Sequence, residues 1–229
     1  MEFNIRGTTM QVVDIQLNES ESVFTAAGGM SWMSSNIKME TDSKGGLFKG
    51  IGRSMSGESF FMNIYTCEQG TGVISFAADA PGKVIPMRLE QGKSIICQQG
   101  TFLAGEYSVS IQVHFTKRLG AGFFGGEGFI LQKISGPGQV FLEICGEITE
   151  YELQEGQVLK VDPGHIGAFE ESVTYDITTV SGLKNKLFGG EGFFLATVQG
   201  PGKVWLQSMP MDKLAKRIAK SLPSKRRRS

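Results

Sequence analysis

The clearest pattern in the chain is a strict alternation of apolar and polar side chains in the segment YSVSIQVHF, residues 107–115. An alternation of period two is typical of a strand with one buried and one wet face. Similar short apolar runs, separated by glycine or Pro-Gly turns about every 8 to 12 residues, predict an all-β sandwich or closed roll. The apolar face of this segment is predicted to carry Tyr107, Val109, Ile111, Val113 and Phe115.

The period changes at the C-terminal end, where Leu214, Ile218 and Leu222 recur at helical spacing before Pro223. Asp212 suits the start of a helix, and cations suit its end. This segment therefore predicts a short amphipathic helix with a basic tail. Its basic residues are Lys213, Lys216, Arg217 and Lys220, followed by Lys225, Arg226, Arg227 and Arg228.

The chain also contains an internal repeat. Residues 124–142 and 188–206 match at 12 of 19 positions with an offset of 64, where unrelated segments would match at about one. A more diverged copy begins near residue 20. We predict β units at 1–82, 83–147 and 148–208, followed by the helix and tail at 209–229. Units this small bury too little surface to be stable alone, so they should pack side by side, and the outer edges invite self-association.

Each predicted unit contains a Gly-Glu-x-Phe motif followed by an apolar strand and a glycine turn. Equivalent glutamates are compatible with a ring of carboxylates for a cation or a basic partner. The alternative, which we favour, is a structural glutamate that accepts hydrogen bonds from turn amides or contacts a neighbouring unit. The motif residues are Gly57 and Glu58, Gly126 and Glu127, and Gly190 and Glu191.

Recognisable catalytic or metal-binding motifs are missing from the sequence. His114 and His165 are far apart and occupy different places in their repeats, unlike the paired histidines of a metal site. Cys97 and Cys145 lie in apolar runs and are predicted to be buried, inert thiols. The glycine-rich segment 120–125 fits a dinucleotide pattern but has no βαβ context. We therefore expect no enzyme activity, catalytic residue, metal or cofactor.

The formal net charge of zero conceals an uneven distribution. Eight of the 23 basic residues follow Asp212, which leaves 15 basic against 23 acidic residues in 1–212. The chain also lacks an apolar leader after a basic start and a run of about 20 apolar residues. These features predict a cytoplasmic protein with an acidic body and a basic tail.

The Gly-Glu-x-Phe motifs followed by Gly-Pro-Gly turns, the segments FFGGEGF and FGGEGFF, and the C-terminal helix resemble the bacterial branch of the altered-inheritance-of-mitochondria, or mitochondrial biogenesis, family. The resemblance covers about residues 8–222. It implies a fold like that of the tryptophan RNA-binding attenuation protein, with three β-rolls per chain and three chains in a ring. It implies no established catalytic site.

The tail is the best candidate contact surface in the sequence. Its helix is compatible with docking on the β body, with binding at an anionic membrane surface, or with binding to nucleic acid. We interpret the chain as a non-enzymatic, homo-oligomeric scaffold or binding protein, a trimer that is peripheral to a membrane through this tail. The alternative is a nucleic-acid-binding ring. Nucleic acid is the less favoured partner because the body of the protein is acidic.

Overall fold

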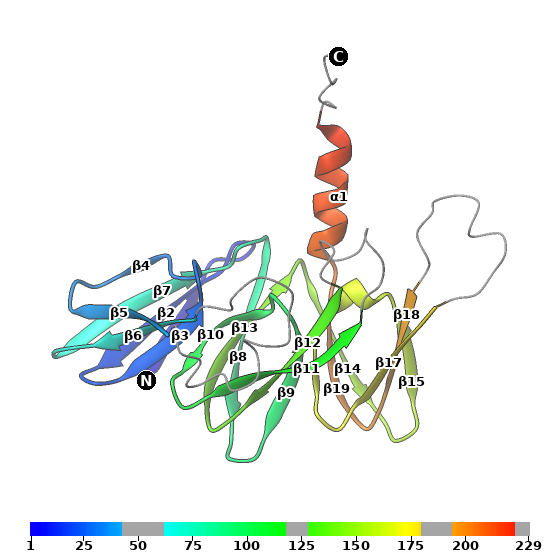
Figure 1. Cartoon of the computed structure of the whole chain (residues 1–229), viewed down its shortest axis with the longest axis horizontal. Coiled ribbons are helices and arrows are strands. Elements are labelled where there is room, and N and C mark those ends of the chain that lie inside the picture. Colours follow the sequence, from blue (N-terminus) through cyan, green and yellow to red (C-terminus); the bar gives the residue numbers. More distant parts are fainter. Residues whose placement is uncertain (43–61, 118–127, 180–193, 223–229) are drawn as a thin grey trace.

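The computed structural model describes residues 1–42, 62–117, 128–179 and 194–222, which form four antiparallel sheets and one α-helix (Figure 1). The prediction of an all-β protein with a short C-terminal helix is confirmed. The first sheet has the order β1 (Glu2–Arg6), β2 (Val12–Asn18), β7 (Thr71–Ala77) and β4 (Trp32–Met33).

The two central sheets have six strands each and the last sheet has three. The second sheet has the order β5 (Ile37–Asp42), β6 (Met62–Cys67), β3 (Ser22–Ala26), β10 (Phe102–Glu106), β13 (Gly138–Cys145) and β8 (Gly82–Leu89). The third has the order β11 (Ser110–Lys117), β12 (Phe129–Ser135), β9 (Ser94–Gln98), β16 (Ile166–Glu170), β19 (Gly202–Gln207) and β14 (Ile148–Leu153). The fourth has the order β15 (Val158–Val161), β18 (Phe194–Gln199) and β17 (Thr174–Thr179).

The strand orders repeat along the chain. We call β2–β7, β8–β13 and β14–β19 the first, second and third strand sets. The order β2-β7-β4 recurs as β8-β13-β10 and β14-β19-β16, and the order β5-β6-β3 recurs as β11-β12-β9 and β17-β18-β15. Each six-stranded sheet therefore joins half of one set to half of the next, through β3 with β10 and through β9 with β16.

The second and third sets also share their hydrogen-bonded registers at a spacing of 64 residues. Leu89 pairs with Gly138, and Leu153 pairs with Gly202. The turns that follow β8 and β14 contain Gly92 and Gly156, whose φ angles of 79° and 75° lie in the left-handed region that glycine tolerates. The boundaries predicted at residues 82, 147 and 208 stay predictions.

Three hydrophobic cores separate the four sheets. The first core lies between the first and second sheets, the middle core between the second and third, and the last core between the third and fourth. Every residue of β13 is buried because this strand is packed on both faces. Phe141 enters the first core, whereas Val140 and Leu142 enter the middle core.

The prediction for residues 107–115 is right for the middle of the segment and wrong at both ends. Tyr107 precedes β11 and is 45 % exposed, so it does not belong to the buried face. Val109 and Ile111 are buried in the middle core, and Val113 packs against it. The register shifts between Val113 and Phe115, and an extra residue in a strand sends the following side chains to the other face. Phe115 therefore packs against the last core, with its ring 5.5 Å from that of Tyr175.

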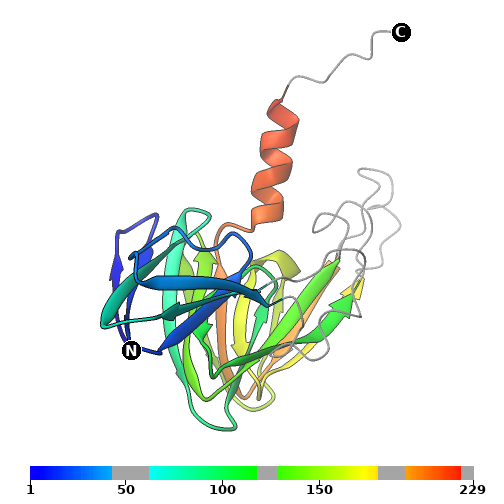
Figure 2. The same cartoon turned by 60° about the vertical axis from the view of Figure 1, so that its left-hand side comes forward.

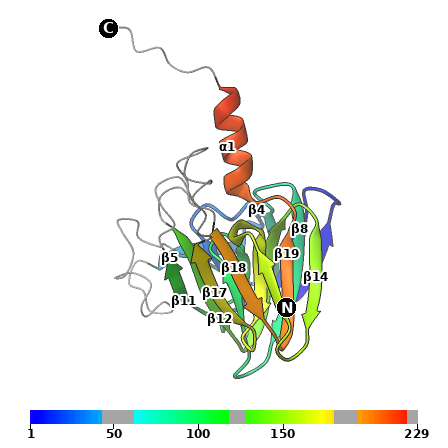
Figure 3. The same ribbon diagram turned by 90° about the vertical axis from the view of Figure 1, so that its right-hand side faces the viewer.

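Helix α1 (Met211–Ser221) follows β19 directly and has no buried residue. It stands away from the strands in three views of the molecule (Figures 1, 2 and 3). A short 3₁₀ helix, η2 (Pro163–His165), lies beside its base and contributes the contacts that hold the first turn.

Candidate contact surfaces

The apolar stripe of α1 is open to solvent along the outer half of the helix. Leu214 is partly buried near the base, but the side chains of Ile218 and Leu222 are 53 % and 64 % exposed. The described part of the body therefore leaves this stripe uncovered, contrary to the hypothesis that the helix docks on the strands. Met211, at the start of the helix, is 45 % exposed.

The base of α1 is held by charged and polar contacts of Lys213. Its Nζ lies 2.9 Å from Asp162 Oδ2 and 2.9 Å from His165 Nε2. His165 Nδ1 lies 2.8 Å from the carbonyl oxygen of Gln207. Because a lysine ammonium can only donate, Nε2 accepts and Nδ1 carries the proton that is donated to the carbonyl. Lys213 is thus part of the anchor of the helix.

The other predicted basic residues of the helix lie beyond this anchor. Lys216 is partly buried, whereas Arg217 and Lys220 are exposed, and the carbonyl of Arg217 accepts a hydrogen bond from the Ser221 hydroxyl. The helix thus presents cations beside an exposed apolar stripe. The remaining predicted tail residues, Lys225, Arg226, Arg227 and Arg228, lie outside the described residues.

The glycine and glutamate positions of the repeated motif also lie outside the described residues. This applies to Gly57, Glu58, Gly126, Glu127, Gly190 and Glu191. Their predicted role in turns or contacts between units stays a prediction.

A pocket of about 460 Å³ lies at the base of α1, between Met211 and Ala215 of the helix and the ends of the central strands. The buried Glu143 carboxyl lines it and accepts a hydrogen bond from the Asp79 amide at 3.0 Å. Burial raises the pKa of the Glu143 carboxyl, which the Asp79 amide opposes. Cys145 also lines this pocket, and burial raises the pKa of its thiol to about 11.

The thiols show no sign of reactivity. All three cysteines are buried and free, so the prediction of buried thiols at Cys97 and Cys145 is confirmed. Burial raises the pKa of the Cys97 thiol to about 12. A thiol with such a pKa is almost wholly protonated at neutral pH, and the protonated form is a poor nucleophile and metal ligand.

A second pocket, of about 370 Å³, lies at the outer end of the third strand set. We call it the end pocket. Tyr151 of β14, Leu159 of β15 and Leu206 of β19 supply apolar side chains, and Asp162 and His165 of the helix anchor lie at its border. Tyr151 is 42 % exposed, which is high for a residue with an apolar ring on the core side of a sheet.

An exposed tryptophan marks the opposite end of the body. Trp32 of β4 is 50 % exposed. Sequence reasoning missed both Trp32 and the end pocket. The sequence does contain a signal for Trp32, because tryptophan stands where the other two strand sets have alanine. This difference can be recognised only after the strands are aligned by their pairing.

Within the described residues, no group of three or more His, Cys, Asp or Glu side chains is placed to hold a metal ion. The same residues include no helix long and apolar enough to span a membrane. The features that stand out are surfaces: the free helix, the exposed tryptophan and the end pocket.

The fold and these surfaces define an all-β protein of stacked antiparallel sheets with a free amphipathic helix at its C-terminal end. Residues 3–209 match the family model described as Mitochondrial biogenesis AIM24, and the chain belongs to that family. The family part of the predicted resemblance is thereby confirmed, whereas the likeness to the tryptophan RNA-binding attenuation protein stays a prediction.

Two streptococcal proteins are similar over nearly the whole chain. An uncharacterised protein of Streptococcus pyogenes serotype M6 is 29 % identical over 233 residues, which cover 98 % of this chain and 92 % of the relative. A crystal structure of a Streptococcus pyogenes protein has a TM-score of 0.76 and 27 % identity, and the match covers 96 % of this chain and 99 % of that chain.

Proposed function

We propose that the protein is a non-enzymatic, homo-oligomeric scaffold that contacts an anionic membrane surface through α1 and the basic residues after it. The proposal rests on the exposure of α1, in which Ile218 and Leu222 face solvent beside the exposed Arg217 and Lys220. A helix with an apolar stripe and a basic flank can lie in the interface of a bilayer and attract anionic headgroups.

The energies favour several copies acting together. Each lysine or arginine near an anionic leaflet contributes on the order of 1 kcal/mol. A single helix of this length, with three large apolar residues, would bind weakly and reversibly. Linked copies of the same helix on one assembly would raise the overall affinity through effective concentration, without any new kind of contact. The scaffold and the membrane contact therefore support each other.

The homo-oligomer is supported by the two ends of the body. Among the described residues, β4 is paired with β7 alone and β15 with β18 alone, whereas their counterparts in the central sheets are paired on both sides. Unpaired edges of this kind favour association with another chain. We propose a head-to-tail ring of three chains, as the resemblance to the attenuation protein implies, in the cytoplasm.

Co-sedimentation with liposomes tests the membrane contact. The full chain and a chain that ends at Met209 are compared on neutral and on anionic vesicles, at low and high salt. We expect that only the full chain pellets, that it needs anionic lipid, and that high salt weakens its binding.

Two matched variants separate apolar from purely electrostatic binding. Ile218→Gln with Leu222→Gln removes the stripe, and Lys216→Gln with Lys220→Gln removes two cations. Both double variants should weaken membrane binding. Only Lys216→Gln with Lys220→Gln should weaken binding to single-stranded RNA through the tail, because that binding depends on charge. A full chain that ignores anionic vesicles but binds RNA would overturn the membrane proposal and favour the nucleic-acid alternative.

A further inference from the structure

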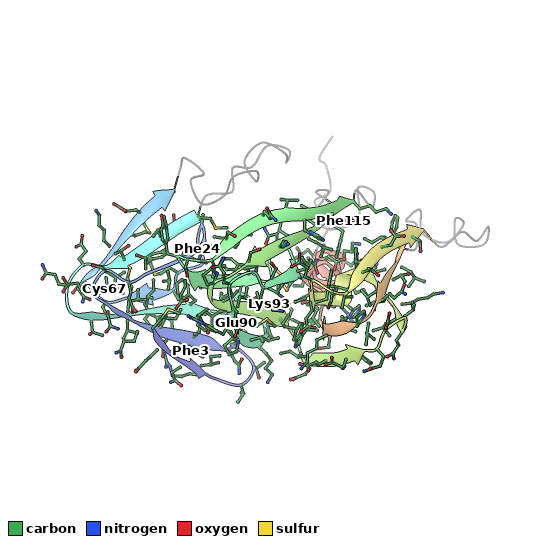
Figure 4. All side chains as sticks on the ribbon, turned by 90° about the horizontal axis from the view of Figure 1, so that it is seen from below. Phe3, Phe24, Cys67, Glu90, Lys93 and Phe115 are labelled. Atoms are coloured by element: carbon green, nitrogen blue, oxygen red, sulfur yellow. The ribbon has the colours of Figure 1, made fainter. Side chains whose placement is uncertain are left out.

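The two internal junctions between strand sets are made in the same way. At the first junction Phe24 of β3 pairs with Gly105 of β10, and at the second Ile96 of β9 pairs with Phe169 of β16. Phe24, labelled in Figure 4, belongs to the middle core. Its ring stacks on that of Phe102 of the second strand set, with the ring centroids 5.2 Å apart.

The same junction is half present at each end of the body. In the first strand set β4 holds the place of β10 and β16, and in the third set β15 holds the place of β3 and β9. These two strands lie at opposite ends of the molecule (Figure 1). A second copy placed end to end would therefore bring β4 of one chain beside β15 of the other and complete a six-stranded order like those of the central sheets.

At the β4 end the sizes of two paired side chains are reversed relative to the internal junctions. At both internal junctions the strand nearest the junction carries a small alanine, and its cross-strand partner is a large aromatic residue that packs in or against the adjoining core. On β4 the order is reversed, so the large residue is on the junction strand and the small one is behind it. The cross-strand pairs are Ala104 with Phe141, Ala168 with Trp205, and Trp32 with Ser75.

The middle core shows what a side chain at this position packs with. Ala168 and Trp205 share that core with residues of the second strand set. Five of these residues of the second strand set have counterparts in the third set, 64 positions later in the chain, and all five counterparts line the end pocket. The end pocket thus corresponds to the part of the middle core that surrounds Ala168 and Trp205, but among the described residues no strands equivalent to β16 and β19 cover it. The core residues are Ile85, Met87, Leu142, Ile95 and Cys97, and their counterparts are Thr149, Tyr151, Leu206, Leu159 and Val161.

We propose that Trp32 of one copy fills the end pocket of a second copy, with β4 and β15 paired antiparallel. The register of Ala168 opposite Cys97 transfers to Trp32 opposite Val161, and Met33 then lies opposite Lys160. A tryptophan side chain buries about 150 to 250 Å² and fits a pocket of about 370 Å³. The contact uses different surfaces on the two copies, so it repeats from chain to chain and ends when a ring closes.

This inference rests on the proposed homo-oligomer and names the residues of the contact between its chains. We call the contact of Trp32 with the end pocket of the next chain the joint. The test measures the mass of the full chain in solution by light scattering over a range of concentrations. Trp32→Ala should weaken association about 30-fold or more, as expected for an aromatic anchor in a desolvated pocket. The control is Met39→Ala, which removes an apolar side chain of nearly equal exposure, 48 %, from β5.

The outcomes separate this joint from the oligomer itself. A wild-type chain that stays monomeric at every concentration overturns both proposals. An oligomer that survives Trp32→Ala as well as it survives Met39→Ala overturns the joint and leaves the oligomer standing. Because Trp32 is half exposed, its loss should leave the unfolding midpoint of the monomer nearly unchanged, and this is checked by thermal melting.

Mixing two defective chains tests the direction of the contact. Thr149→Phe fills the end pocket from within, while Trp32→Ala leaves that pocket open. At a concentration where the wild-type chain associates but each variant alone is monomeric, a mixture of the two variants should form a one-to-one dimer that does not grow. In that dimer the intact Trp32 of one chain enters the open pocket of the other. A mixture that stays monomeric would contradict the proposed joint.

Discussion

Replacing Phe24 by alanine tests how the strand sets share their cores. Phe24 is wholly buried, belongs to β3 of the first strand set, and lies in the middle core with residues of the second set. Truncation of a buried phenylalanine costs about 3 to 5 kcal/mol, which combines lost transfer free energy with the cavity left behind. The lost stacking on Phe102 accounts for about 0.5 to 1.5 kcal/mol of such a cost.

The matched control is Phe3→Ala. Phe3 also contacts a buried ring, since its centroid is 5.0 Å from that of Phe141, but its side chain is 41 % exposed. Its truncation should cost about 1 kcal/mol or less, because much of its surface already faces water. The measurement is equilibrium unfolding in urea, followed by near-UV and far-UV circular dichroism.

If the sets share their cores as described, Phe24→Ala lowers the urea midpoint in one transition seen by both probes. Two separate transitions, or a loss no larger than that of Phe3→Ala, would refute the reasoning. In the first case the first and second sets would unfold independently, and in the second case the Phe24 side chain would contribute little to the middle core.

Three further predictions concern individual side chains. The Tyr175 hydroxyl is buried without a hydrogen-bond partner among the described residues, so Tyr175→Phe should raise the unfolding free energy by about 1 kcal/mol or leave it unchanged. Burial raises the pKa of Glu143 in the folded chain, so the folded state binds the extra proton and stability falls as pH rises through and above the usual glutamate range. Glu143→Gln should remove this fall in urea titrations compared at about pH 4 and pH 7. Cys97, which is wholly buried, should react with a thiol reagent at pH 8 only as fast as the chain opens, so a reaction rate near that of a free thiol would contradict its burial.

The strand content could be predicted because local patterns dominate it. Alternation marks Val109 and Ile111 as inward-facing, and glycines with positive φ, such as Gly92, mark the turns. The shift after Val113 could not be predicted, because a bulge depends on the pairing partner and not on the segment alone. The same limit explains why the prediction for Phe115 is wrong.

The contact surfaces were harder to predict than the fold. The pattern of Leu214, Ile218 and Leu222 predicts an amphipathic helix, but periodicity cannot tell whether its apolar stripe is covered, since a neighbouring strand would look the same in the sequence. Trp32 and Tyr151 look like ordinary apolar strand residues. Their exposure follows from the topology, which leaves one half of a sheet at each end of the body.

The two proposed contacts meet at the base of α1. Asp162 and His165 line the end pocket, and both bind Lys213, the residue that anchors the first turn of the helix. An indole seated in that pocket would shield the Lys213 contacts from water, and a charged hydrogen bond is stronger in a less polar environment. Joining of chains would therefore stiffen the anchor from which each helix projects. The joint and the membrane contact are thus adjacent parts of one surface, and loss of Trp32 should weaken vesicle binding more than the loss of multivalency alone accounts for.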